Sequence, residues 1–191
     1  GATGNVGREI LSILAERKFP ADQVVALASR NSIGREVSYG DTKTLKVQAL
    51  EDYDFTGTAI GLFSPGGSVS AIHAPRAAEA GCVVIDNTSH FRMDKNVPLI
   101  VPEVNPEAIA GYKKSGIIAK PNCSTIQMVL VLAPLHKKYN IKRVIVSTYQ
   151  SITGTGVKAV KQLENEYAGI QGEMAYKYPI HRNAIPQCDV F

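Results

Sequence analysis

Cys123 is the side chain with the clearest potential for covalent chemistry, and it lies in the segment KPNCSTIQ at residues 120–127. An apolar helical pattern begins directly behind it, and Pro121 separates it from the preceding segment. A sulfur anion at the start of a helix is stabilised by the helix dipole and by unpaired backbone N–H groups. The same N–H groups, together with the Asn122 side chain, could stabilise the oxyanion that forms on an attacked carbonyl. Cys123 and Asn122 are therefore candidate catalytic residues. The alternative, a buried structural cysteine, suits Cys82 better, because Cys82 belongs to an apolar stretch.

A glycine-rich segment, GATGNVG at residues 1–7, could hold a dinucleotide. Gly1, Gly4 and Gly7 permit a tight turn, a close backbone approach to a pyrophosphate, and close packing of a helix on a strand. The amphipathic helix predicted behind the turn directs its free N–H groups and positive dipole end at the phosphates, and Asn5 can help to cap it. The alternative is a plain turn between a strand and a helix. Because strands and helices then alternate, we favour cofactor binding.

The tip of the next predicted strand bears on which nucleotide binds. NAD sites usually place an acidic residue there, which binds the ribose hydroxyls. This chain instead has Ser29, Arg30, Asn31 and Ser32, and Asp22 lies at the opposite end of the strand. An arginine with neighbouring hydroxyls suits the 2′-phosphate of NADP through charge-assisted hydrogen bonds. We therefore predict NADP, against the alternative that Arg30 is a solvated loop residue.

Two further polar segments follow predicted strands. The glycines of SPGGS, residues 64–68, let the backbone pass close to a ligand, so Ser64 and Gly66 are candidate cofactor contacts; a simple turn explains the segment equally well. Arg92, in NTSHFR at residues 87–92, could clamp a phosphate bidentately, and the alternative is a surface ion pair. None of the four histidines lies in a pattern that identifies a general base.

The apolar pattern predicts an α/β protein. Strands that alternate with helices indicate a Rossmann-like, doubly wound parallel sheet. A glycine turn of this kind normally follows a buried strand, so we expect the first strand to be missing from a chain that starts at Gly1. Helices are predicted at residues 6–17, 69–80, 124–139 and 157–167, strands at 23–29, 59–63, 82–86, 117–119 and 142–150, and a hairpin within 36–48.

A change in composition near Pro121 divides the chain into two predicted domains. Residues 1–121 are expected to form the NADP-binding Rossmann-like domain. Residues 122–191 are expected to form the start of an α+β catalytic and dimerisation domain. We expect this second domain to be incomplete, because the chain stops before its core could close.

Composition narrows the class of protein. The chain has 191 residues, 45% hydrophobic and 20% charged, with a formal net charge of +4, as in an ordinary globular protein. Scattered basic residues argue against a nucleic-acid groove. Three cysteines without a paired framework favour a reducing compartment, and the longest apolar run, residues 126–135, is about half of what a bilayer requires. Since no leader pattern is present, we expect a cytoplasmic protein without nucleic-acid, membrane or metal partners.

Together these segments resemble the amino-terminal part of the aspartate-semialdehyde dehydrogenase family. The segments around Cys123 and Gln150 are specific to this family, whereas many dehydrogenases share the glycine turn. The family usually reads Ser-x-Arg-Ser in its cofactor loop, so Arg30 is displaced by one place. The matching segments, in the family's order, are GATGNVG (1–7), LFSPGGS (62–68), DNTSHFR (86–92), VPEVN (101–105), PNCSTIQ (121–127) and STYQ (147–150).

The resemblance implies roles for the matched residues. Cys123 would form an acyl thioester, Gln150 would bind the amino-acid end of the substrate, and Arg92 would hold its phosphate. The family's catalytic histidine lies in a carboxyl-terminal stretch that these 191 residues lack, so we expect the chain alone to show negligible activity. NADP would be contacted by Thr3, Gly4, Asn5, Val6, Arg30, Asn31, Ser32, Thr153 and Gly154.

By the same resemblance, the full protein would be an oxidoreductase that reduces L-aspartyl 4-phosphate to L-aspartate 4-semialdehyde with NADPH and releases phosphate. This step feeds lysine, threonine and methionine synthesis. The protein would assemble as a homo-oligomer, either a dimer or a tetramer. Two alternatives stay open: an N-acetyl-glutamyl-phosphate reductase, which uses the same chemistry, and a non-catalytic NADP-binding module. The segments around Cys123 and Gln150 favour the aspartyl enzyme.

Overall fold

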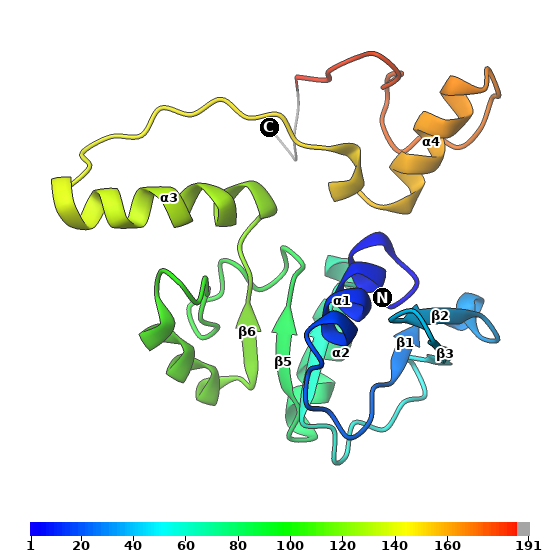
Figure 1. Ribbon diagram of the computed structural model, residues 1–191, viewed down its shortest axis with the longest axis horizontal. Coiled ribbons are helices and arrows are strands. Elements are labelled where there is room, and N and C mark those ends of the chain that lie inside the picture. The colour runs from blue at the N-terminus through cyan, green and yellow to red at the C-terminus, as the bar shows by residue number, and fades with distance from the viewer. Residues whose placement is uncertain (187–191) are drawn as a thin grey trace. The chain divides into compact units, whose positions relative to one another are not determined.

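A computed structural model describes residues 1–186 of the chain (Figure 1). The chain divides into two compact units, residues 1–146 and residues 147–191. The domain boundary expected between residues 121 and 122 stays a prediction. The last five residues of the predicted second domain, 187–191, lie outside the described residues.

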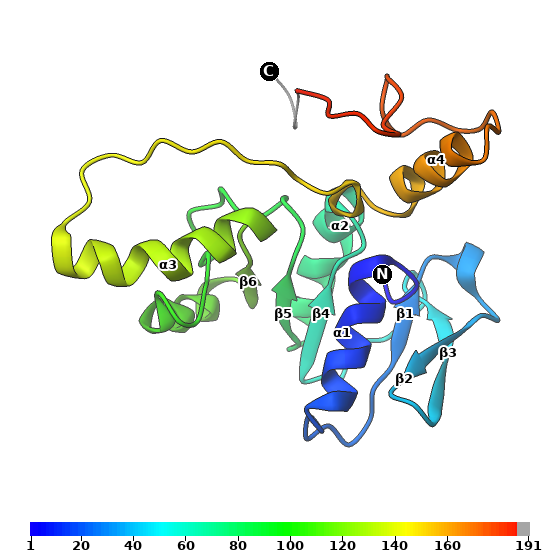
Figure 2. The same ribbon diagram turned by 45° about the horizontal axis from the view of Figure 1, so that its top comes forward.

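The first unit contains a mixed three-stranded sheet made of β1 (Ala26–Ala28), β2 (Glu36–Tyr39) and β3 (Lys43–Ala49), in the order β1-β3-β2. β1 pairs with β3 in parallel, and β2 pairs with β3 as an antiparallel hairpin. Helix α1 (Asn5–Glu16) lies against this sheet (Figure 2), because Leu11 packs into a buried cluster with apolar residues of all three strands. This helix and this sheet position the glycine turn, which directly precedes α1.

A second sheet in the same unit is entirely parallel. It contains β4 (Ile60–Phe63), β5 (Val83–Asp86) and β6 (Ile117–Ala119), in the order β4-β5-β6. Helix α2 (Gly67–Glu79) connects β4 to β5 and buries its small side chains Ala74 and Ala77 completely in the core of this sheet. Because the three strands are parallel, their carboxyl ends lie at one edge, and the loops that follow them meet there.

The structure confirms the α/β class and most of the predicted elements. The helices α1, α2, α3 (Cys123–Tyr139) and α4 (Val157–Tyr167) lie where the apolar spacing predicts them. Strand β6 has the predicted bounds, whereas β1, β4 and β5 are shorter than predicted. The hairpin turns at Gly40, whose φ of 67° favours glycine. Short 3-10 helices at Arg30–Ser32, Pro106–Lys114 and Ile152–Gly154 were not predicted.

The strand predicted at residues 142–150 is wrong. These residues form neither a helix nor a strand, and no strand among residues 1–186 pairs with them. The apolar side chains on which the prediction rested stay exposed: Val144 is 49% exposed and Val146 is 56% exposed. Alternating apolar and polar residues form a strand only where a neighbouring strand provides backbone hydrogen bonds. Residues 1–186 contain no such neighbouring strand for this segment.

The second unit is built around a buried amide side chain. Gln162 of α4 is 1% exposed. Its Nε2 donates to Glu166 Oε1 at 2.7 Å and to the Tyr178 carbonyl at 3.2 Å. Its Oε1 accepts from the backbone N–H groups of Ala175 and Tyr176, both at 2.8 Å. Because all these groups are satisfied together, Gln162 fixes the loop after α4 onto that helix.

Among residues 1–186, the structure contains no helix with the length and apolar character needed to span a bilayer.

Candidate active site

A cavity of about 370 Å³ lies at the carboxyl ends of β1, β3 and β4. The start of α1 and the first turns of α2 complete its walls. In a sheet of this kind ligands bind at the carboxyl edge, so this is the expected place for a dinucleotide. The lining residues are Gly1, Thr3 and Gly4 of the glycine turn, Ala28 and Ser29 at the end of β1, Leu50 and Glu51 after β3, Ser64 and Pro65 after β4, and Ser68, Val69, Ile72 and His73 of α2.

The glycine turn has the backbone geometry that a phosphate cradle requires. Ala2 N–H donates to the Leu27 carbonyl of β1 at 2.9 Å, and Gly4 N–H donates to the Gly1 carbonyl at 3.0 Å. A Cβ at Gly7 would collide with the Gly1 carbonyl and would lie 2.8 Å from Ala2 Cα, so only glycine fits there. The turn is thus close-packed through its backbone alone, which leaves its outer side open to a ligand.

The start of α1 offers free N–H groups to an anion. Gly4 is the N-cap residue, and no side chain caps the helix. The expectation that Asn5 helps to cap α1 is therefore wrong, because Asn5 is already the first helical residue. Helices leave their first N–H groups without an internal partner, and these groups attract phosphate. Asn5 and Val6, both exposed, carry two of them, which suits their predicted cofactor contact.

The predicted ribose-phosphate residues lie beside the cavity rather than in its lining. Arg30, Asn31 and Ser32 form a short 3-10 helix directly after Ser29. The Ser32 hydroxyl is buried and lies 3.5 Å from that of Thr3, which lines the cavity. The Arg30 guanidinium is exposed and forms an ion pair with Asp52 at 2.5 Å. Hydroxyl and guanidinium donors are therefore gathered at this end of the cavity.

The loop after β4 also approaches the glycine turn. Ser64 lines the cavity, and its carbonyl lies where a Cβ at Gly1 would be placed. Gly66 is the N-cap residue of α2, with a φ of 97° that favours glycine. Thr3, Gly4 and Ser64 are thus brought together in one cavity, with Gly66 next to it.

Several residues that line the cavity were not predicted from the sequence: Leu50, Glu51, Val69, Ile72 and His73. The end of β3 reaches the cavity because β3 pairs in parallel with β1 as well as antiparallel with β2. A hairpin pattern reveals only the second of these pairings.

Burial lowers the pKa of His73 below its ordinary value, and the Arg76 cation lowers it further, whereas Glu51 raises it. The imidazole of His73 is therefore mainly neutral at neutral pH, where it forms part of the cavity wall.

Cys123 is exposed at the first position of α3. Asn122 is the N-cap residue of α3, and its Oδ1 accepts a hydrogen bond from Ser124 N–H at 3.0 Å. The Cys123 sulfur lies 3.9 Å from the same oxygen. The cap holds the first turn of α3 in place, so the sulfur sits at the positive end of a helix of 17 residues. Cys82, by contrast, is buried, and burial raises the pKa of its thiol, which keeps it protonated and inert.

The Arg92 side chain forms hydrogen bonds with the backbone of the segment that precedes Cys123. Its Nε donates to the Lys120 carbonyl at 2.9 Å, and its Nη2 donates to the Asn87 carbonyl at 3.0 Å. Lys120 N–H in turn donates to the Asp86 carbonyl at the end of β5, at 2.8 Å. The structure therefore places Arg92 beside the peptide three residues before Cys123, at the carboxyl edge of the parallel sheet that also carries Ser64.

Gln150, Thr153 and Gly154 belong to the second unit. Thr153 donates to the Ser151 hydroxyl through its N–H at 3.3 Å and through its own hydroxyl at 3.0 Å. A Cβ at Gly154 would lie 2.9 Å from Nε2 and 3.4 Å from Cδ of Gln150. Gly154 therefore leaves the space in which the Gln150 amide rests.

Two family models match the chain and account for this arrangement. The model of the semialdehyde dehydrogenase NAD-binding domain matches residues 1–112, and the model of the semialdehyde dehydrogenase dimerisation domain matches residues 132–191. The chain belongs to the semialdehyde dehydrogenase family. The cavity at the glycine turn lies within the NAD-binding domain of this family, and Cys123 lies between the two matched regions.

Relatives and solved structures of the semialdehyde dehydrogenase family confirm the resemblance. The aspartate-semialdehyde dehydrogenase of Aquifex aeolicus is 50% identical over the whole chain, which spans 58% of that protein's length. The crystal structure of aspartate-semialdehyde dehydrogenase II from Vibrio cholerae complexed with ASA has a TM-score of 0.91 and 47% identity, over 100% of this chain and 58% of that one. The Candida albicans enzyme with NADP has a TM-score of 0.61 and 32% identity, over 74% of this chain and 46% of that one.

Proposed function

We propose that the full-length protein is an NADP-dependent aspartate-semialdehyde dehydrogenase. It would reduce L-aspartyl 4-phosphate to L-aspartate 4-semialdehyde and release phosphate, for the synthesis of lysine, threonine and methionine. The observation that carries the proposal is the exposed sulfur of Cys123 at the start of α3, next to the parallel-sheet edge where the cofactor cavity lies. The similar proteins of Aquifex and Vibrio, named aspartate-semialdehyde dehydrogenases, support the choice of substrate.

In the proposed reaction the thiolate of Cys123 attacks the carbonyl carbon of the acyl phosphate. A carbon–sulfur bond forms, and the carbon–oxygen bond to phosphate breaks, so that phosphate leaves with the bonding electron pair. NADPH, when bound, supplies the hydride that reduces the thioester. Collapse of the hemithioacetal on Cys123 then releases the aldehyde and restores the thiolate. Backbone N–H groups of the first turn of α3 would stabilise the oxyanion, and Asn122 holds that turn in place.

Arg92 and Gln150 are proposed to bind the two ends of the substrate. The two hydrogen bonds from Arg92 to backbone carbonyls fix its guanidinium against the segment that precedes Cys123, and its other N–H groups would bind the phosphate. Gln150 would bind the amino-acid end, with its amide positioned by Gly154.

The residues at the cavity fit NADP. The backbone cradle of the glycine turn and the free start of α1 suit a pyrophosphate, and Arg30 with Ser32 suits a 2′-phosphate. We propose contacts from Thr3 to Val6, from Arg30 to Ser32, from Ser64 and Gly66, and from Thr153 and Gly154. The Candida relative, solved with NADP, supports this choice.

The match of residues 132–191 to a dimerisation domain supports assembly of the full-length protein as a homo-oligomer, which we propose is a dimer or a tetramer. We place it in the cytoplasm, where a reducing environment keeps the Cys123 sulfur in its thiol form.

A substrate comparison tests the proposed function. The full-length protein is assayed with L-aspartyl 4-phosphate and with N-acetyl-glutamyl phosphate, each with NADPH, by following loss of NADPH absorbance. We expect kcat/KM for the aspartyl substrate to exceed that for the acetylated substrate by about a hundredfold or more, because a site that binds a free amino acid rejects an acylated one. Faster turnover of N-acetyl-glutamyl phosphate would replace the proposal with the reductase, and turnover of neither would indicate a non-catalytic module.

The contact between Gly154 and Gln150 gives a prediction about substrate binding. Gly154→Ala places a methyl group against the Gln150 amide and displaces it, without strain in the backbone. We expect KM for the substrate to rise about fivefold to tenfold, while the melting temperature changes by less than about 2 °C. In a double-variant cycle, Gly154→Ala should add little to Gln150→Ala, because both remove the same interaction. An unchanged KM would show that Gly154 does not position this amide.

A further inference from the structure

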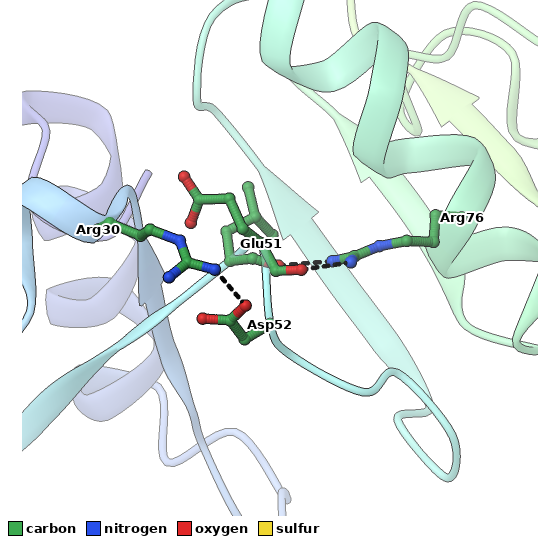
Figure 3. A network of polar contacts seen from close by, with 5 residues as sticks. Arg30, Glu51, Asp52 and Arg76 are labelled. Atoms are coloured by element: carbon green, nitrogen blue, oxygen red, sulfur yellow. Dashed lines mark hydrogen bonds and ion pairs between the residues drawn. The ribbon is translucent and has the colours of Figure 1, made fainter.

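Arg76 of α2 fixes the loop that follows β3. Its Nη2 donates to the Leu50 carbonyl at 2.5 Å, and its Nη1 donates to the Glu51 carbonyl at 2.8 Å. Its guanidinium also lies over the Phe55 ring, 5.2 Å from the centroid. Figure 3 shows the Arg76 side chain reaching across to this loop from α2. Arg76 therefore holds the loop that carries Asp52, and these contacts do not involve the Asp52 side chain.

Asp52 and Arg30 leave the sheet at corresponding points. Ala28 of β1 is paired in parallel with Ala49 of β3, and Leu50 N–H donates to the Ala28 carbonyl at 2.9 Å. Arg30 lies two residues after Ala28, and Asp52 lies two residues after Leu50. The parallel register thus brings the two side chains side by side at the cavity end, where Arg30 Nη2 lies 2.5 Å from Asp52 Oδ1 (Figure 3).

We propose that Asp52 is a specificity-determining residue for the cofactor, because its carboxylate competes with a 2′-phosphate for the guanidinium of Arg30. This inference rests on the proposed NADP dependence. In the structure Asp52 Oδ1 pairs with one nitrogen of the guanidinium, and its negative charge opposes that of Arg30. The 2′-phosphate proposed to bind Arg30 is the group by which NADPH differs from NADH. Asp52 therefore narrows the preference for NADPH that Arg30 alone would produce.

The sign of the effect follows from charge and exposure. The side chains of Arg30 and Asp52 are 62% and 58% exposed, so their ion pair contributes little to stability and can open. A phosphate monoester carries close to two negative charges at neutral pH, so a neighbouring carboxylate repels it. NADH has a neutral hydroxyl at the same carbon and gains or loses little from either residue.

Direct binding to the full-length protein tests the role of Asp52. The dissociation constants of NADPH and NADH are measured by titration calorimetry for the parent and for Asp52→Asn, which keeps the size of the side chain and removes its charge. We expect the variant to bind NADPH about threefold to tenfold more tightly, while NADH affinity changes by less than about twofold. The NADPH gain should shrink as ionic strength rises.

Two controls separate this role from general charge effects. Asp22→Asn removes an exposed carboxylate from the opposite end of β1 and should leave both constants unchanged. In an Arg30→Ala background, Asp52→Asn should improve NADPH affinity by a clearly smaller factor than in the parent, because only the direct repulsion between carboxylate and phosphate remains.

The outcomes distinguish this inference from the proposed function. If the parent binds NADPH but Asp52→Asn binds it equally or more weakly, the role of Asp52 is overturned and the proposed function stands. If Asp52→Asn improves NADPH affinity as much in the Arg30→Ala background as in the parent, Asp52 does not compete for Arg30, and the inference is also overturned. If the parent binds neither nucleotide, the proposed cofactor dependence fails together with this inference.

Discussion

Replacement of Cys123 by serine is expected to lower kcat of the full-length protein by roughly a thousandfold or more, while NADPH affinity stays within about twofold of the parent value. Serine preserves the size of the side chain and the first turn of α3, but its hydroxyl is a far weaker nucleophile than a thiolate. Cys123 is exposed, so the change leaves no cavity in the core. Steady-state kinetics and nucleotide titration of the same preparation measure the two quantities.

Cys82→Ala is the matched control for this variant. Cys82 is the other cysteine among residues 1–186, and it is buried in the core of the parallel sheet. Its loss should cost about 1 kcal/mol of stability and leave kcat unchanged. If Cys123→Ser retained kcat within about tenfold of the parent value, covalent catalysis by this sulfur would be refuted.

Gly7→Ala is expected to weaken NADPH binding by about tenfold or more and to lower the melting temperature by several degrees. The new methyl group would meet the Gly1 carbonyl and Ala2 Cα. Both obstacles are backbone atoms, so the glycine turn itself must move, and the cradle for the pyrophosphate moves with it. Nucleotide titration at a temperature where the variant is folded separates lost binding from lost stability.

Gly111→Ala provides the comparison for this change. A Cβ at Gly111 would lie 3.5 Å from Pro98 Cβ, an ordinary contact, and Gly111 is not one of the residues that line the cavity. Its NADPH affinity should equal that of the parent. Normal NADPH affinity of Gly7→Ala would show that the turn does not cradle the cofactor.

Local patterns were sufficient to predict the elements that position the site. The spacing of apolar residues located α1, and the strand–helix alternation placed β4, α2 and β5 in a parallel arrangement. The polar segment before a predicted helix distinguished Cys123 from the other cysteines, and the structure places it where a helix dipole acts on it. These features depend on near neighbours in the chain, which is why sequence reveals them.

Features that depend on partners distant in sequence could not be predicted. The parallel pairing of β3 with β1 brings Glu51 to the cavity and Asp52 to Arg30, and no periodicity encodes it. The alternation at residues 142–150 predicted a strand, yet a strand exists only where another strand pairs with it, and none among residues 1–186 does.

Mass spectrometry of a trapped acyl-enzyme tests the central claim most directly. The full-length protein is incubated with L-aspartate 4-semialdehyde and NADP⁺ in the absence of phosphate, so that the thioester forms and cannot be released by phosphorolysis. We predict a mass increase of one aspartyl acyl group on the peptide that contains Cys123, its removal by added phosphate, and its absence from Cys123→Ser. Formation of NADPH without any acyl group on Cys123, or with the group on another residue, would contradict the account.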